Sequence, residues 1–96
     1  MTPADFARSL SKRHPPAAYA PALQALWFAA KDDWKAAHDV VMAHDDKDCA
    51  WVHAHLHRLE GDLDNARYWY RRAGKRPATG AFDAERNAII ATLAAD

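Results

Sequence analysis

A glycine followed by an aspartate near the middle of the chain, Gly61-Asp62, constrains the fold more than any other feature. Glycine takes the left-handed conformation that often follows the last turn of a helix, and an aspartate can cap the free amides of the next helix. The apolar residues that follow at helical spacing are Leu63, Ala66, Tyr70 and Ala73, with Gly74 after them. The sequence therefore predicts two helices joined by a tight turn, which is a helical hairpin.

Proline, glycine and capping residues divide the remainder of the chain into further helices. The expected helices cover about residues 2–10, 18–30, 34–43, 47–60, 63–73 and 82–95. Pro21 leaves two alternatives for the second of these, because a proline either begins a helix or kinks it. In the last helix we expect Phe82, Ile89, Ile90 and Leu93 to pack inward, and Asp83, Glu85 and Arg86 to face solvent. The predicted fold is all-α, with about five to six helices in a single domain of residues 1–96.

Two parts of the chain are alike when one is shifted by 29 residues. The shift superposes Ala25 on Ala54, Phe28 on His57, Asp33 on Asp62, Trp34 on Leu63, Ala37 on Ala66 and Val41 on Tyr70. Small residues let the two helices of each unit approach closely, and the large residue after the turn, Trp34 or Leu63, is expected to fill the open end. We therefore predict one hairpin at about residues 18–43, a second at about 47–74, and a C-terminal packing helix at about 82–95.

The segment GDLDNARYWYRRA, residues 61–73, resembles the second half of a tetratricopeptide or Sel1-like repeat. Such repeats favour a glycine, an apolar residue, an alanine, an aromatic residue and a second alanine at the positions occupied here by Gly61, Leu63, Ala66, Tyr70 and Ala73. The upstream copy departs from this pattern, with Asp32 at the turn and His44 at the last alanine, and its period of 29 is shorter than the family's usual length. The resemblance covers about residues 22–77 and implies a right-handed stack of antiparallel hairpins. The string WVHAHLHRLEGD also resembles small bacterial proteins with such hairpins, which implies no activity.

Six histidines are many for 96 residues, and three of them alternate within one expected helix. His53 and His57 lie four residues apart and share a face, which is the spacing that zinc-binding helices use, whereas His55 faces elsewhere. Catalytic zinc sites have three protein ligands, so a third would come from another helix, with His38 or Asp62 as candidates. The simpler alternative is a pair of part-buried imidazoles that hydrogen-bond, pack on aromatic residues and have lowered pKa values.

A basic and aromatic cluster is the second candidate site. Its residues are Arg58, Tyr68, Trp69, Arg71 and Arg72. Arginines beside aromatic rings grip phosphate or stack on bases, and an exposed cluster of this kind also suits a protein or peptide partner. The alternative is a solvated helix face on which arginine stems cover tryptophan.

Charge and composition argue against several classes of function. With 13 basic and 13 acidic residues the formal charge is zero, which argues against nucleic acid and anionic lipid and favours self-association. No apolar run approaches the ~20 residues of a membrane span, and no signal segment opens the sequence. The single cysteine, Cys49, cannot form an internal disulfide. We expect a cytoplasmic protein.

These features predict a non-enzymatic module that binds a protein or peptide, needs no cofactor and is able to form homo-oligomers. The alternative is a small metal-binding protein or enzyme that uses His53 and His57, with His38 as the further ligand. No catalytic residue is assigned, because the sequence has no glycine-rich phosphate loop and no serine in a nucleophile elbow. Cys49 lies on the apolar face of its expected helix, so we expect a buried, inert thiol.

Overall fold

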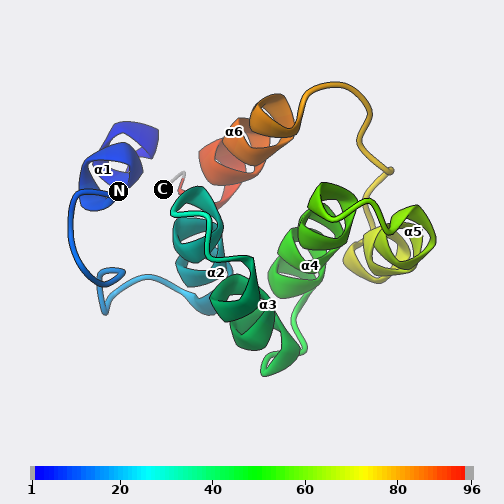
Figure 1. Cartoon of the computed structure of the whole chain (residues 1–96), viewed down its shortest axis with the longest axis horizontal. Helices are drawn as coiled ribbons and strands as arrows, with labels where there is room; N and C mark the ends of the chain where they lie inside the picture. Colours follow the sequence, from blue (N-terminus) through cyan, green and yellow to red (C-terminus); the bar gives the residue numbers. More distant parts are fainter. Residues whose placement is uncertain (1, 95–96) are drawn as a thin grey trace.

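The structure, a computed structural model that describes residues 2–94, is built of helices joined by turns and loops (Figure 1). Within those residues the helices are α1 (Pro3–Ser9), α2 (Pro21–Ala30), α3 (Trp34–Met42), α4 (Lys47–Leu59), α5 (Leu63–Ala73) and α6 (Phe82–Leu93). The prediction of an all-α fold with five to six helices is confirmed.

The ends of two helices refine the prediction. α2 begins at Pro21, so the proline opens the helix and does not kink it, since its fixed φ suits the first turn. α6 is helical to Leu93, and residue 95, the expected end, lies outside the described part of the chain. α1 begins with a capping box, in which the Thr2 hydroxyl accepts from the Asp5 amide and the Asp5 carboxylate accepts from the Thr2 amide.

The turns after α2 and α4 have the same hydrogen bonds at positions 29 residues apart. The amide of Asp33 donates to the carbonyl of Phe28, and the amide of Asp62 donates to the carbonyl of His57, each at 2.9 Å. The residue before each aspartate is left-handed, with φ of 61° at Asp32 and 84° at Gly61. This is the Schellman pattern of helix termination, and Gly61 is the helix terminator that the sequence predicted.

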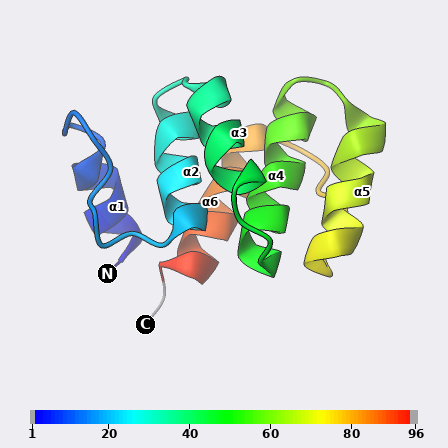
Figure 2. The same ribbon diagram turned by 90° about the horizontal axis from the view of Figure 1, so that it is seen from below.

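α4 lies at the centre of the molecule. It packs against α2 and α3 on one side, against α5 on another, and against α6 (Figures 1 and 2). α2 packs against α3 in the same side-by-side manner as α4 packs against α5, and α6 crosses behind α2 and α4. The alanines at the two helix contacts are Ala25, Ala37, Ala54 and Ala66, each at most 2 % exposed. Their small side chains allow the close approach that the spacing predicted.

α1 is attached at the edge of this arrangement by its side chains and its C-terminal carbonyl groups. Phe6 is buried in the main core. The indole Nε1–H of Trp27 donates to the carbonyl of Ser9 at 3.1 Å, and the ammonium group of Lys31 donates to the carbonyl of Leu10 at 2.7 Å. Two side chains at the end of α2 therefore hold the C-terminal end of α1 by its carbonyl groups.

Three side chains are placed differently from the prediction. Leu63 is 54 % exposed and does not fill the open end of its helix pair, because it stands at the first position of α5 on the solvent side. Phe82 is also largely exposed and lies against the guanidinium of Arg58, 4.8 Å from the ring centroid. Glu85, expected to face solvent, is only 8 % exposed, because three side chains hydrogen-bond to its carboxylate inside the protein.

Candidate metal centre

Three histidines from two helices converge between α3 and α4. His53 and His57 share one face of α4, as their spacing predicted, and His38 approaches them from α3. The Nε2 atoms of His38 and His53 are 3.1 Å apart, and one ring nitrogen from each histidine lies within 4.8 Å of the other two. We call His38, His53 and His57 the histidine centre. Its two α4 members are buried and His38 is half-buried, so the centre lies just below the surface.

Glu60 orients the imidazole of His57. The Nδ1–H of His57 donates to the Glu60 carboxylate at 2.7 Å, which leaves Nε2 as the nitrogen with a free lone pair. Histidines that bind metals commonly donate their other ring N–H to a carboxylate in this way. His57, Glu60 and Asp62 also lie close enough together to form a second group of three possible ligands at the surface. In that group Glu60 is occupied by His57, and Asp62 caps the start of α5.

Tryptophans line the histidine centre on two sides. The Trp34 ring stacks on His38 with centroids 4.7 Å apart, and the Trp69 ring stacks on His53 at 3.8 Å. Burial, together with the neighbouring His57 and His38, lowers the pKa of His53 to about 3. The pKa of His38 is also lowered, mainly by burial. These two imidazoles are therefore neutral at physiological pH, which is the state that binds a metal ion. The lowering at His53 agrees with the prediction for a part-buried histidine.

The spacing of the nitrogens is close to what a metal ion requires. Two ligands of a tetrahedral zinc ion, each at ~2.1 Å, are separated by ~3.4 Å. The His38–His53 distance of 3.1 Å already approaches this value. The largest separation is at most 4.8 Å, so zinc binding would require this distance to shorten. Without a metal, the same two Nε2 atoms satisfy each other by one N–H···N hydrogen bond.

The opposite face of α4 carries a separate polar cluster. The Glu85 carboxylate accepts from the Nδ1–H of His55 at 2.6 Å, from Arg58 at 3.1 Å and from the Tyr70 hydroxyl. Arg58 also donates to the carbonyl of Gly80. Burial alone would raise the pKa of Glu85, but these hydrogen bonds outweigh burial and hold it below its usual value. We call His55, Arg58, Tyr70 and Glu85 the Glu85 network. No buried side-chain nitrogen or oxygen among the described residues lacks a hydrogen-bond partner, and the network is a structural element joining α4, α5 and α6.

The basic and aromatic cluster is brought together only in part. Arg72 donates to the Tyr68 hydroxyl at 3.1 Å and to Asp45 at 2.8 Å, and its guanidinium lies 5.5 Å from the Trp69 ring centroid. Arg71 is exposed on the same helix. Arg58 is 8 % exposed and belongs to the Glu85 network, so it does not join the surface of α5.

Sequence reasoning identified the members of the histidine centre but not the Glu85 network. Glu85 is four residues before the buried Ile89, so helical spacing alone places it on the inward face of α6. Its charge argued for the outward face, and its partner His55 is 30 residues away. Cys49 is a buried thiol, as expected, and burial raises its pKa to about 12. It is therefore a protonated side chain at neutral pH.

Comparison with known proteins gives no information on function, so the chemistry of the histidine centre is the main guide. No protein-family model, curated protein or solved structure matches the chain. Across residues 2–94, each helix is too short or too polar to pass through a bilayer. What the fold and the site define is a small all-α protein with three imidazoles converging beside two tryptophans.

Proposed function

We propose that this protein binds a divalent transition-metal ion of the zinc class at the histidine centre. The observation that carries the proposal is the convergence of three ring nitrogens, from two helices, within 4.8 Å of one another. Neutral imidazole suits zinc and related ions, and three protein ligands leave a fourth tetrahedral position for water or an added ligand. His38, the least buried of the three, stands on the side that faces solvent.

Two further contacts support a metal site. The carboxylate of Glu60 fixes the His57 ring with one nitrogen free, as outer-shell carboxylates do for metal-binding histidines. Trp34 and Trp69 hold the His38 and His53 rings by stacking, which reduces the conformational entropy that these ligands lose on binding. The centre is therefore organised before any ion arrives.

The decisive experiment is a zinc titration of chelator-treated protein, followed by melting temperature and by tryptophan fluorescence. We expect one zinc per chain and a change in fluorescence, because Trp69 stacks directly on a ligand. At a free zinc concentration of 100 times the dissociation constant, stabilisation should reach about 2.7 kcal/mol by mass action. The double variant His53→Gln/His57→Gln should lose both effects.

Two histidines outside the centre provide a matched control. His14 and His44 are both exposed, so the variant His14→Gln/His44→Gln removes the same number of imidazoles while it leaves the centre intact. It should bind zinc like the parent chain. Equal zinc stabilisation of the parent and the His53→Gln/His57→Gln variant would refute the proposal and leave the three histidines as a purely structural cluster.

A second candidate function is binding of a protein or peptide partner on α5. Arg72 is held between Tyr68 and Asp45, and both Tyr68 and Arg72 are exposed, which supports an amphipathic docking face. The same face is a candidate for self-association. Selection from a displayed peptide library tests the first idea, with Tyr68→Ser/Arg72→Ser as the variant and Arg67→Ser, exposed elsewhere on α5, as the control. Sedimentation at two concentrations tests the second, because Tyr68→Ser/Arg72→Ser should abolish any concentration dependence.

The architectural part of the proposal concerns the helix pairs. We place α2–α3 and α4–α5 as two degenerate tetratricopeptide-like hairpins in a right-handed stack, within a cytoplasmic protein. The identical hydrogen bonds of the two turns, 29 residues apart, support this assignment. A non-enzymatic role fits the Glu85 network, whose hydrogen-bonding groups satisfy one another.

A further inference from the structure

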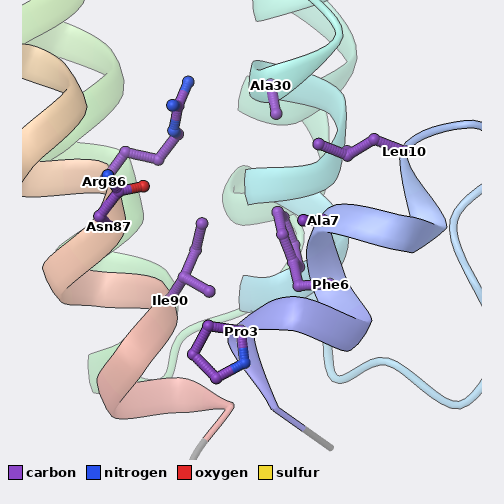
Figure 3. Close-up of a pocket in the computed structure, with 8 residues that line it drawn as sticks. All are labelled: Pro3, Phe6, Ala7, Leu10, Ala30, Arg86, Asn87 and Ile90. Carbon is purple, nitrogen blue, oxygen red and sulfur yellow. The ribbon is translucent and has the colours of Figure 1, made fainter.

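A groove between α1 and α6, far from the histidine centre along the chain, has no role in the proposed metal site. Figure 3 shows Phe6 and Ala7 of α1, with Leu10 directly after the helix, facing Ile90, Asn87 and Arg86 of α6, with Pro3 at one end and Ala30 at the other. We call this space the α1–α6 groove. Its volume is about 340 Å³, which is at the small end of ligand pockets, typically ~300–1,000 Å³. The size favours a compact ligand over a folded partner.

The groove is apolar along its length and basic at one end. Phe6 and Ile90 form a buried apolar base, and Pro3 closes the end that has no charged group among its lining residues. The Arg86 side chain extends toward the Ala30 end in Figure 3. At that same end the ammonium group of Lys31 sits on the carbonyl of Leu10, at 2.7 Å. The lining thus matches a ligand with an apolar body and one negatively charged head.

Arg86 is available to such a ligand. Among residues 2–94 the Arg86 guanidinium pairs with Asp83, at 3.7 Å, and the Asp83 side chain is 81 % exposed. A long ion pair with a solvent-exposed carboxylate contributes little to stability. A ligand carboxylate can therefore replace Asp83 on the guanidinium at a small cost in free energy. A planar guanidinium donates two parallel hydrogen bonds to the two oxygens of a carboxylate. A ligand with an amine or alcohol head group has no such pair of acceptor oxygens.

We propose that the α1–α6 groove binds a medium-chain aliphatic monocarboxylate, with its hydrocarbon chain along Phe6 and Ile90 and its carboxylate on Arg86. The inference is independent of the histidine centre, which lies between α3 and α4. Binding buries apolar surface of both partners, and the head group fixes the direction of the chain in the groove.

The test is a calorimetric titration of the full chain in chelator with octanoate, octanol and octylamine, which share a hydrocarbon tail and differ in the head group. We expect octanoate to bind at least about tenfold more tightly than octanol, because the charge-assisted hydrogen bonds need the carboxylate. Octylamine should not bind measurably. Amide chemical-shift changes should be confined to α1, the end of α2 and α6.

Two variants separate the groove from nonspecific binding. Ala7→Trp fills the groove from an exposed position and should abolish octanoate binding, whereas Ala4→Trp, exposed on the same helix outside the groove, should not. Arg86→Gln should weaken octanoate by at least about tenfold and leave octanol unchanged. If Ala7→Trp does not fold, the ratio of octanoate to octanol affinity in Arg86→Gln is sufficient to test the proposal.

Four results would overturn the proposal. They are no octanoate binding to the parent, equal binding of octanoate and octylamine, an unchanged octanoate affinity in Arg86→Gln, and tighter binding of a short peptide with a C-terminal leucine than of octanoate. The last result would assign the groove to a peptide C-terminus.

Discussion

The helix pairs α2–α3 and α4–α5 have equivalent turns but differ in the side chains that they bury. Their turns have equivalent hydrogen bonds, and each pair has buried alanines where its helices meet. The buried residues of α2 are all apolar: Ala22, Leu23, Ala25, Leu26 and Trp27. α4 buries three histidines and an arginine in addition to its apolar residues.

This difference shows which buried residues a helix pair of this kind requires and which are particular to α4. The first pair shows that apolar side chains are sufficient for such a contact between helices. Buried polar groups are costly unless partnered, so the imidazoles of α4 are not there to improve packing. One face of α4 joins His55 to a carboxylate, whereas the other leaves His53 and His57 facing a third imidazole. Only the second arrangement brings three imidazole ring nitrogens together, and a metal ion there would replace the hydrogen bond between His38 and His53.

The largest expected effect is removal of the carboxylate from the Glu85 network. Glu85→Ala leaves the buried Arg58 without its ion-pair partner and two other donors without an acceptor. Loss of one partner of a buried pair typically costs ~3–5 kcal/mol. Urea denaturation measures the change, with Asp83→Ala, exposed on the same helix, as the control at ~0.5 kcal/mol or less. Similar values for both variants would mean that the second helix pair does not depend on its buried charge.

Acid should weaken the second helix pair through His53. Because its folded-state pKa is lowered to about 3, the unfolded chain binds a proton more readily than the folded chain. Stability conferred by neutral His53 is therefore complete above the unfolded pKa of ~6.5 and falls by up to about 1.4 kcal/mol per pH unit below it. Melts of metal-free protein at pH 7 and pH 5 should show this loss. His53→Phe should reduce it, since phenylalanine cannot be protonated; an unchanged pH dependence in that variant would exclude His53 as the cause.

Overpacking the helix contacts should affect both pairs equally. Ala37→Leu and Ala66→Leu each insert a large side chain where the helices meet, at a typical cost of ~1–3 kcal/mol. Ala36 is half-buried beside the contact, so Ala36→Leu should cost less. Chemical denaturation of the three variants measures the ranking. If Ala66→Leu were no worse than Ala36→Leu, the equivalence of Ala37 and Ala66 would be lost.

The smallest effects concern the turns, where the two pairs should respond in opposite directions. Gly61→Val should destabilise by about 1 kcal/mol or more, because a β-branched residue resists a positive φ. No atom lies within 4 Å of an added Cβ at Gly61, so the cost comes from the backbone alone. Asp32 already has a positive φ, and Asp32→Gly should be neutral or slightly stabilising. Thermal melts compare them; destabilisation by Asp32→Gly would show that its side chain has a role of its own.

Local chemistry explains why the helices and turns were predictable. Gly61, Asp62 and Gly74 act on backbone groups within a few residues, and their effects do not depend on the rest of the fold. The shared face of His53 and His57 follows from helical geometry in the same way. Their meeting with His38 was anticipated only as one of two alternatives, because it depends on how α3 packs on α4.

The parts that the sequence did not predict depend on tertiary contacts. Glu85 was expected in solvent because an isolated carboxylate is rarely buried, and only the fold supplies the three donors that make its burial tolerable. Arg58 was grouped with Arg71 and Arg72 from sequence proximity, although it lies on a different helix and pairs with Glu85. Leu63 was expected to pack against its helix pair because it is equivalent to Trp34 in the 29-residue shift. Trp34 is held by a hydrogen bond from its indole N–H to the carbonyl of Leu56, at 2.7 Å, and leucine has no such donor.

The alternation of histidines on α4 also fixes the rotational setting of that helix. A turn of about 100° about its axis, one residue step, would carry the imidazoles away from both sets of partners at once. An apolar helix such as α2 has neighbouring settings that differ only in packing. Any such rotation of α4 would leave buried polar groups without hydrogen-bond partners. We therefore expect a rotated α4 to be much less stable and the central helix to adopt a single orientation.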